Sequence, residues 1–285
     1  MDARGLYENR RHGTPDFPVG VYRIDREAGE TVLDNHWHAE AEFLALEKGT
    51  AVFQIGLATY EVHAGEALYI PGGELHGSYA AANAPCAYSA LVFDLDWLAY
   101  GQDAAAIRWL QPLRRGEIAF PRHLSRSCPV GPEIYRIVTS LTAPERTDRA
   151  GWALRIKGGL YTAFAELADA GLNVTEKPET RTPGSLLQVL TYMEKHYDRR
   201  LTIKELAGIA RMSEGHFSRL FKCYVRKTPI EYLNGLRLRL AAEKLREPGV
   251  SVAEAAISCG FDNFSYFSKL FRSRYRCTPS DYRKT

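Results

Sequence analysis

The chain has 285 residues, 45% of them hydrophobic and 25% charged, a balance that excludes wholesale disorder and allows two or three domains with cores of their own. Its formal net charge of +3 is unevenly divided: residues 185–285 carry 19 Lys and Arg against 10 Asp and Glu, a net of +9, and residues 1–184 carry 18 against 24, a net of −6. A basic module joined to an acidic domain is typical of anion binding, although a merely solvated basic surface has the same composition.

Targeting signals are not evident. The N-terminus lacks the apolar run of a secretory signal, and no window approaches the roughly 18–20 uninterrupted apolar residues that a membrane helix needs. The five cysteines are scattered and odd in number, which favours reduced thiols. We therefore expect a cytoplasmic protein with no membrane partner.

The first predicted elements are strands, over about residues 19–97. Short β-branched and aromatic runs such as TAVFQIG and ATYEVH alternate in part, and Gly, Asn and Asp interrupt them about every 8–12 residues. This spacing is typical of an antiparallel sandwich or a small barrel. We assign residues 1–130 to this domain, with an N-terminal arm.

Three histidines and a glutamate stand out inside the β domain. His36, His38 and Glu42 share one face of a strand because side chains alternate with a period of two, and His76 ends the run GEALYIPGGELH. The two segments resemble the cupin motifs G-x5/6-H-x-H-x3-E-x6-G and G-x5-P-x-G-x2-H-x3-N, with Ala80 in place of the final Asn. The resemblance implies a cupin barrel. It also implies a site that would hold Zn²⁺, Ni²⁺, Fe²⁺ or Mn²⁺, the alternative being a polar pocket lining for an organic effector.

Aromatic residues near these motifs suit an aromatic or sugar effector, but they are equally expected in the barrel core. They are Trp37, Tyr60, Tyr69 and Tyr79. The histidines without such neighbours are expected at the surface or at helix ends: His12, His63, His123, His196 and His216.

Helices are predicted over about residues 131–170, where apolar residues recur at three- and four-residue steps. We expect the resulting stripe to pair two protomers into a homodimer; it consists of Leu154, Leu160, Phe164 and Leu167. The polar, Pro- and Gly-containing segment 171–184 is predicted to be a linker.

Everything after the linker is predicted to be helical, with breaks at prolines and glycines. Thr202 is the expected N-cap of a helix, with Glu205 completing a capping box. We place helix-turn-helix 1 at about 202–225, a linker helix at about 229–247 and helix-turn-helix 2 at about 250–276.

These boundaries rest on a pattern that the chain contains twice. FSRLFKCYVRKTP, from Phe217 to Pro229, recurs as FSKLFRSRYRCTP, from Phe267 to Pro279. Eight of 21 ungapped positions are identical between residues 213–233 and 263–283. A short helix and a turn precede each basic copy, and this arrangement is the helix-turn-helix, whose second helix enters the major groove of DNA.

Helical spacing separates two roles within each copy. The apolar positions of the first copy are expected in the core: Phe217, Leu220, Phe221 and Tyr224. Arg219 and Lys269 suit base edges, whereas Lys222 and Arg272, one turn further on, suit phosphates. The alternative for all four charges is a solvated helix face. The linker helix would span about 28 Å at about 1.5 Å per residue, close to the roughly 34 Å between successive major grooves.

The second copy, GFDNFSYFSKLFRSRYRCTPSDYR, is similar to the signature of the AraC/XylS family of transcription regulators, and residues 185–285 resemble the DNA-binding region of that family. The resemblance implies base-reading positions at Gly215, Ser218, Arg219, Ser265, Ser268 and Lys269, with Phe264 as a groove contact. The predicted DNA-binding set also includes Ser213, Glu214, Asn263, Lys222 and Arg272. Gly215 stands where a larger reader is often found, and Arg226 stands where the family usually has Gly.

Together these features predict an α+β protein with an N-terminal cupin-like sensor barrel, a helical segment, a linker and an all-α DNA-binding domain. We expect a transcription regulator that binds double-stranded promoter or operator DNA, responds to a small-molecule effector or a metal, forms a homodimer and contacts RNA polymerase. The alternative is a metal-dependent cupin enzyme, an oxygenase or isomerase, fused to a DNA-binding module. The sequence contains no nucleophile motif or phosphate loop, which favours regulation.

Overall fold

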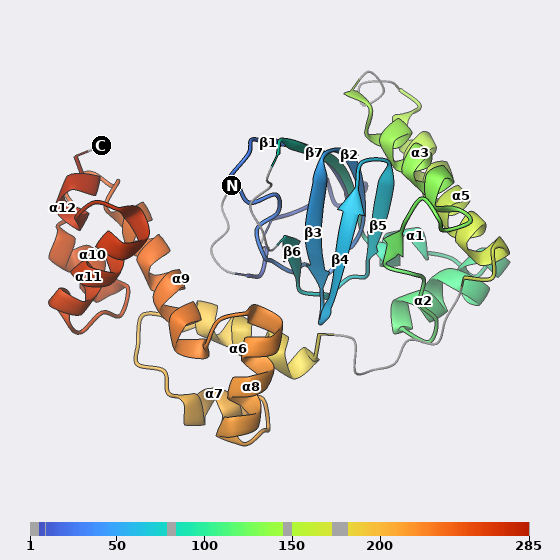
Figure 1. Cartoon of the computed structure of the whole chain (residues 1–285). Helices are drawn as coiled ribbons and strands as arrows, with labels where there is room; N and C mark the ends of the chain where they lie inside the picture. Colours follow the sequence, from blue (N-terminus) through green and yellow to red (C-terminus); the bar gives the residue numbers. More distant parts are fainter. Residues whose placement is uncertain (1–5, 9, 79–83, 145–149, 173–181, 285) are drawn as a thin grey trace. The chain divides into compact units, whose positions relative to one another are not determined.

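The computed structural model describes residues 6–8, 10–78, 84–144, 150–172 and 182–284. The chain divides into two compact units: Asn9–Thr182, here called the sensor unit, and Met1–Glu8 with Pro183–Thr285, here called the DNA-binding unit. The antiparallel sheets of the first and the helices of the second confirm the predicted α+β class (Figure 1). Within the described residues, no helix combines the length and the apolar character needed to cross a membrane.

Two antiparallel sheets form the sensor unit, one of five strands in the order β1-β7-β2-β5-β8 and one of three in the order β4-β3-β6. The strands are β1 (Val19–Arg26), β2 (Ala41–Lys48), β3 (Thr50–Ile55), β4 (Ala58–His63), β5 (Glu66–Ile70), β6 (His76–Ser78), β7 (Cys86–Phe93) and β8 (His123–Leu124). Short helical elements follow β7: α1 (Leu95–Leu98), the π-helix η1 (Ala106–Leu110) and α2 (Gln111–Arg115).

Strand periodicity divides the sensor core into two parts. Phe43 on β2 faces α3 (Gly131–Thr142) and α5 (Trp152–Asp169), which cover one side of the five-stranded sheet. Leu44, the next residue, belongs to a second cluster that fills the space toward the three-stranded sheet. The two faces of β2 therefore serve different cores, and even-numbered residues such as Glu42 point to the second.

The apolar stripe of α5 packs inside its own chain. Leu160, Phe164 and Leu167 are fully buried in the core that the helix shares with the sheet, whereas Leu154 is 81% exposed. The expectation that this stripe pairs two protomers is therefore wrong for the three buried residues. A sheet within the chain provides the apolar partner that an amphipathic helix requires.

The DNA-binding unit consists of helices, apart from its short N-terminal segment. They are α6 (Gly184–Lys195), α7 (Ile203–Ile209), α8 (Glu214–Val225), α9 (Pro229–Lys244), α10 (Val252–Ser258), α11 (Phe264–Tyr275) and α12 (Pro279–Tyr282). Capping boxes begin α9, through Thr228, and α10, through Ser251. Thr202 caps α7 as expected, but the Glu205 carboxylate accepts from Tyr192 at 2.7 Å and does not return to the Thr202 backbone, so no capping box forms there.

The two copies of the repeat have the same burial pattern. Phe217 and Phe221 of α8 are fully buried, and so are Phe267 and Phe271 of α11, while the basic residues between and after them are exposed. The central helix α9, about 24 Å long at about 1.5 Å per residue, packs against α8, α10 and α11. Its buried Arg237 donates to the carbonyls of Tyr197 and Arg199, each at 2.7 Å, and so fixes the loop before α7.

Candidate functional site

The first candidate surface is formed by α8 and α11, the second helices of the two helix-turn-helix motifs. Ser213 and Asn263 cap these helices: the Ser213 hydroxyl accepts from the His216 N–H at 3.4 Å, and the Asn263 side chain accepts from the Tyr266 N–H at 2.9 Å. The caps leave the first turn of each helix exposed, with Glu214 and Gly215 on α8 and Phe264 and Ser265 on α11. These positions are where a recognition helix meets base edges.

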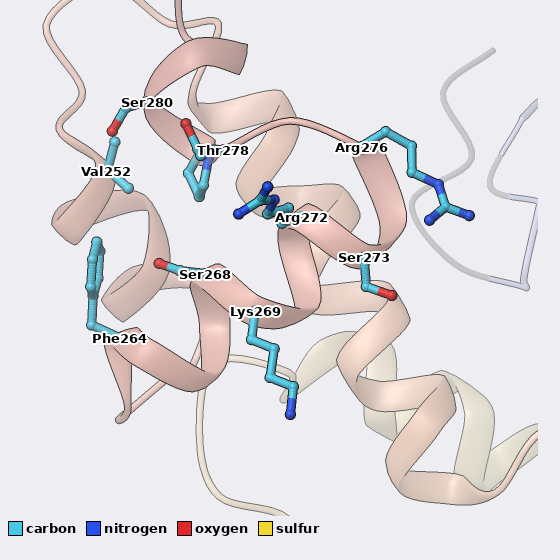
Figure 2. A pocket seen from close by; sticks show the side chains of 10 residues that line it. Val252, Phe264, Ser268, Lys269, Arg272, Ser273, Arg276, Thr278 and Ser280 are labelled. Atoms are coloured by element: carbon cyan, nitrogen blue, oxygen red, sulfur yellow. The ribbon is translucent and has the colours of Figure 1, made fainter.

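The predicted reading residues lie on one exposed face of each helix. Arg219, Lys222, Lys269 and Arg272 are exposed, and Ser218 and Ser268 are half-buried beside them. On α11 this face borders a groove of about 690 Å³, lined among others by Phe264, Lys269 and Arg272 (Figure 2). The arrangement offers cations and hydroxyl groups next to an apolar ring, a combination suited to DNA phosphates and base edges.

The predicted DNA-binding set does not include one exposed aromatic residue of α11. Tyr266 is 46% exposed on the first turn of α11, and its hydroxyl oxygen accepts from the Asn234 side chain of α9 at 3.0 Å. This hydrogen bond holds the start of α11 against the central helix. No local signal identifies it, because the two residues are 32 positions apart.

The second candidate site is a cluster of His36, His38, Glu42 and His76, in which one ligand atom of each lies within 4.8 Å of all the others. His36 and His76 stand opposite each other in an antiparallel bridge, with N–H to carbonyl distances of 2.8 Å in both directions. The Glu42 carboxylate lies 3.3 Å from Nε2 of His38 and 3.4 Å from Nε2 of His76. His38, Glu42 and His76 are at most 3% exposed.

The loop between β5 and β6 holds the cluster together. Gly73 has φ of +79°, and its N–H donates to the His38 carbonyl at 2.7 Å. A Cβ at Gly72 would lie 2.1 Å from the carbonyl oxygen of Ala39, so only glycine allows this close approach. The glycines of the second motif thus bring His76 to the segment that carries the other two histidines.

Backbone carbonyls set the tautomer of each histidine in the cluster. Each Nδ1 faces a carbonyl two residues away, at 2.7 Å for His36 and Asp34, 3.0 Å for His38 and Glu40, and 2.8 Å for His76 and Glu74. A carbonyl oxygen only accepts, so the hydrogen lies on Nδ1 and a neutral ring directs its Nε2 lone pair elsewhere. Nε2 of His38 and Nε2 of His76 both face the Glu42 carboxylate, so these two nitrogens and a carboxylate oxygen are available to one cation.

Burial and neighbouring groups shift the pKa values of His36 and Glu42. Burial, together with His76 and His38, lowers the pKa of His36 to about 3. Burial opposes ionisation of Glu42, but contacts with His38 and His76 outweigh it and hold the pKa of Glu42 below its usual range. A neutral imidazole next to a carboxylate is the state in which these residues bind a divalent metal.

The predicted effector residues that the structure describes differ in their surroundings. Tyr69 is 1% exposed and packs against Phe43 and Phe164, on the sheet face opposite Glu42, so its assignment to the pocket is wrong and the core alternative is right. Trp37 and Tyr60 are half-buried, and the Tyr60 ring lies 5.9 Å from that of His123. Tyr79 lies outside the described residues.

A further histidine adjoins the cluster. His12 is only 2% exposed, so the expectation of a surface position is wrong. Its ring lies 5.2 Å from that of His38, and its Nδ1 is 2.8 Å from the Tyr22 hydroxyl. The segment around His12 has no motif, and only the folded chain brings it to the site.

A buried polar network connects the site loop to the end of the sensor unit. The Glu74 carboxylate accepts from Arg122 at 3.0 Å and from the N–H and hydroxyl of Thr182 at 3.1 and 2.9 Å. The Thr182 hydroxyl also accepts from the Leu75 N–H at 3.0 Å. Glu74 is 2% exposed, and Thr182 is the last residue before the DNA-binding unit.

Comparison with known proteins adds two family matches: an AraC-like ligand binding domain over residues 18–157 and a helix-turn-helix domain over residues 206–285. YdeC of Bacillus subtilis (strain 168), an uncharacterized HTH-type transcriptional regulator, is 24% identical over 283 residues, 99% of this chain and 97% of its own. The HTH-type transcriptional activator RhaS of Klebsiella pneumoniae (strain 342) is 26% identical over 276 residues, 96% of each chain. The HTH-type transcriptional regulator CdhR of Pseudomonas aeruginosa is 38% identical over 95 residues, 33% of this chain and 28% of CdhR.

Proposed function

Because the chain belongs to the AraC/XylS family of DNA-binding transcription regulators, we propose that α8 and α11 read one duplex and that a divalent transition metal in the histidine cluster controls this reading. The two exposed basic faces, equivalent in the repeat, support the first part. The three tautomer-fixed histidines around a buried carboxylate support the second.

The residues that would hold the metal are His36, His38, Glu42 and His76, each through one ligand atom. Three imidazole nitrogens and one carboxylate oxygen suit Zn²⁺, Ni²⁺, Fe²⁺ or Mn²⁺. A bound cation would supply the positive charge that the converging lone pairs lack. The hydrogen bonds from each Nδ1 to the backbone keep the rings oriented toward this point.

The first prediction is that the protein, purified without chelator or histidine tag, contains about one equivalent of transition metal per chain. Elemental analysis measures this. His76→Ala removes one ligand and is expected to lower the metal affinity about tenfold to a hundredfold or more, since even the residues that support metal ligands have effects of that size. His63→Ala, an exposed histidine of β4, is the matched control and retains the metal. Wild-type protein without stoichiometric metal would favour the organic-effector alternative.

The enzyme alternative has weaker support. The relatives that align with nearly the whole chain are transcription regulators. We propose the same role for this chain and assign it no catalytic reaction. Among the described residues, the feature that favours an oxygenase or isomerase is the cluster of three histidines and one glutamate. The two readings separate in one assay: a regulator retards a promoter fragment, whereas an enzyme consumes substrate in the absence of DNA.

Homodimerisation and contact with RNA polymerase complete the proposed mechanism. The outward face of α5, which carries the exposed residues Leu154, Gly158, Thr162 and Ala165, is the face we propose for pairing two protomers. Small residues allow a second helix to approach closely, and Leu154 supplies apolar area.

The second prediction concerns this helix face. The wild-type protein is expected to sediment as a dimer at micromolar concentration, and Leu154→Glu as a monomer, because a charge would be buried in the interface. Leu57→Glu, at another partly exposed leucine, is the control and stays dimeric. A monomeric wild type, with and without Zn²⁺, would contradict the proposed pairing.

A further inference from the structure

Three arginines in the DNA-binding unit have a backbone conformation that favours glycine. Among the described residues, those with positive φ other than glycine are Arg211, Arg226 and Arg276, at 56°, 60° and 60°. In this left-handed region the Cβ of an L-residue approaches the following carbonyl, so Gly, and less often Asn or Asp, normally occupies it. Strain that a fold retains at such a position points to a use for the side chain.

Two of these arginines occupy equivalent positions of the repeat. Arg226 ends α8 and Arg276 ends α11, and the N–H of each donates to the carbonyl four residues earlier, at 3.0 and 2.9 Å. Glycine would make the same hydrogen bond without strain. The helix C-terminus favours a nearby cation, but Lys222 and Arg272 already supply one in the last turn of each helix. Closing the helix therefore does not explain an arginine in both copies.

Each of these arginines adds a cation beyond the basic residues of its recognition helix. Positions 219 and 222 of the first copy and 269 and 272 of the second are helical and three residues apart, so each pair shares one face, and Arg226 and Arg276 follow at the C-caps. Arg276, at the C-terminal end of α11, borders the same groove as Lys269 and Arg272, and its side chain extends away from theirs (Figure 2).

We propose that Arg226 and Arg276 are phosphate clamps, each contacting the DNA backbone beyond the base-reading turns of its helix. This inference rests on the proposed reading of DNA by α8 and α11. A guanidinium group presents parallel N–H donors that match two phosphate oxygens. Because a phosphate contact carries no sequence information, the clamps raise the affinity for every duplex and leave the sequence preference unchanged.

The test measures the binding of the full chain to a mixed-sequence duplex of about 30 base pairs, close to three helical turns, over a fourfold range of salt. Arg226→Gly and Arg276→Gly are each expected to reduce the slope of log K against log salt by about 0.9, and the double variant by about 1.8. When the salt concentration is lowered fourfold, the affinity of each variant then rises about three- to fourfold less than that of the wild type. The unfolding temperature stays the same or rises, because glycine relieves the strained φ.

Two sets of variants separate a clamp from a general loss of charge. Arg211→Gly also removes one positive charge and relieves a positive φ, but at the turn before α8, where the second copy has Gly260. The slope of log K against log salt is expected to stay unchanged in this variant. Arg226→Lys and Arg276→Lys keep the charge and retain the slope. Unchanged slopes in the two glycine variants, or an equal loss in Arg211→Gly, would overturn the clamps. A wild-type protein that shows no salt-dependent binding would instead overturn the proposed reading of DNA.

Discussion

Replacing Arg219 and Lys269 together with alanine is expected to lower the affinity for a selected operator about 10²- to 10⁴-fold. Both side chains are exposed on the second turn of their recognition helices, from which we propose that they reach base edges. A good bidentate base contact contributes about 1–3 kcal/mol of discrimination, and two independent contacts add. Neither residue contributes to the buried core, so the fold is expected to persist.

The measurement compares the operator, selected from genomic fragments, with a mixed-sequence duplex under the same salt. Loss of base reading lowers the operator affinity more than the non-specific affinity, which depends on total charge. Arg200→Ala with Lys284→Ala removes two exposed charges outside the recognition helices and serves as the control. If both double variants lose the same affinity for both duplexes, the charges of α8 and α11 act as a solvated basic surface and do not read sequence.

The features that could be predicted from the sequence are those encoded over a few neighbouring residues. The two recognition helices follow from a repeat whose buried phenylalanines and exposed cations alternate with the helical period. Phe217, Phe221 and Tyr224 are buried as predicted, whereas Leu220 is half-buried. His36, His38 and Glu42 lie together as the motif spacing predicts, but the expectation that they share one strand is wrong: β2 begins at Ala41, and His36 lies in an isolated bridge with His76 before a bend at 39–40. Local patterns thus specify the faces of the elements well.

Pairing between distant segments was beyond these patterns. The stripe around Phe164 shows that α5 has an apolar face, but periodicity alone does not distinguish a sheet of the same chain from a second protomer. Tyr69 has the residue type expected of a pocket, yet its strand position places it on the helix-covered face. The proximity of His12 to His38, across an unremarkable N-terminal segment, depends on tertiary structure alone.

The contact between Glu74 and Thr182 also depends on tertiary structure, because the two residues are 108 positions apart. Its removal has the largest effect on stability that we predict. Glu74→Ala leaves Arg122 buried without its carboxylate and removes the acceptor for the Thr182 N–H and hydroxyl. Breaking a buried ion pair by removing one partner costs about 3–5 kcal/mol, so we expect the free energy of unfolding of the sensor unit to fall by that amount. Chemical denaturation followed by tryptophan fluorescence measures it.

A milder variant tests the regulatory role of this network. Thr182→Val removes the hydroxyl that bonds both the Glu74 carboxylate and the Leu75 N–H but leaves the ion pair with Arg122, at an expected cost of about 1–3 kcal/mol. Glu74 lies in the loop that leads to His76, the first residue of β6, and Thr182 directly precedes the DNA-binding unit. We therefore expect this variant to bind Zn²⁺ like the wild type while its DNA affinity no longer changes with Zn²⁺.

The outcome of this variant decides whether the network connects the proposed metal site to α8 and α11. Thr162→Val, at an exposed threonine of α5, is the matched control and should retain the response to Zn²⁺. Zn²⁺ can change DNA binding only if it has different affinities for two conformations of the protein. The network therefore has a regulatory role only if breaking it reduces this difference in Zn²⁺ affinity. If Thr182→Val keeps the full Zn²⁺-dependent change in DNA affinity, the network of Glu74 and Thr182 has only a structural role. The metal site is then coupled to DNA binding through other residues.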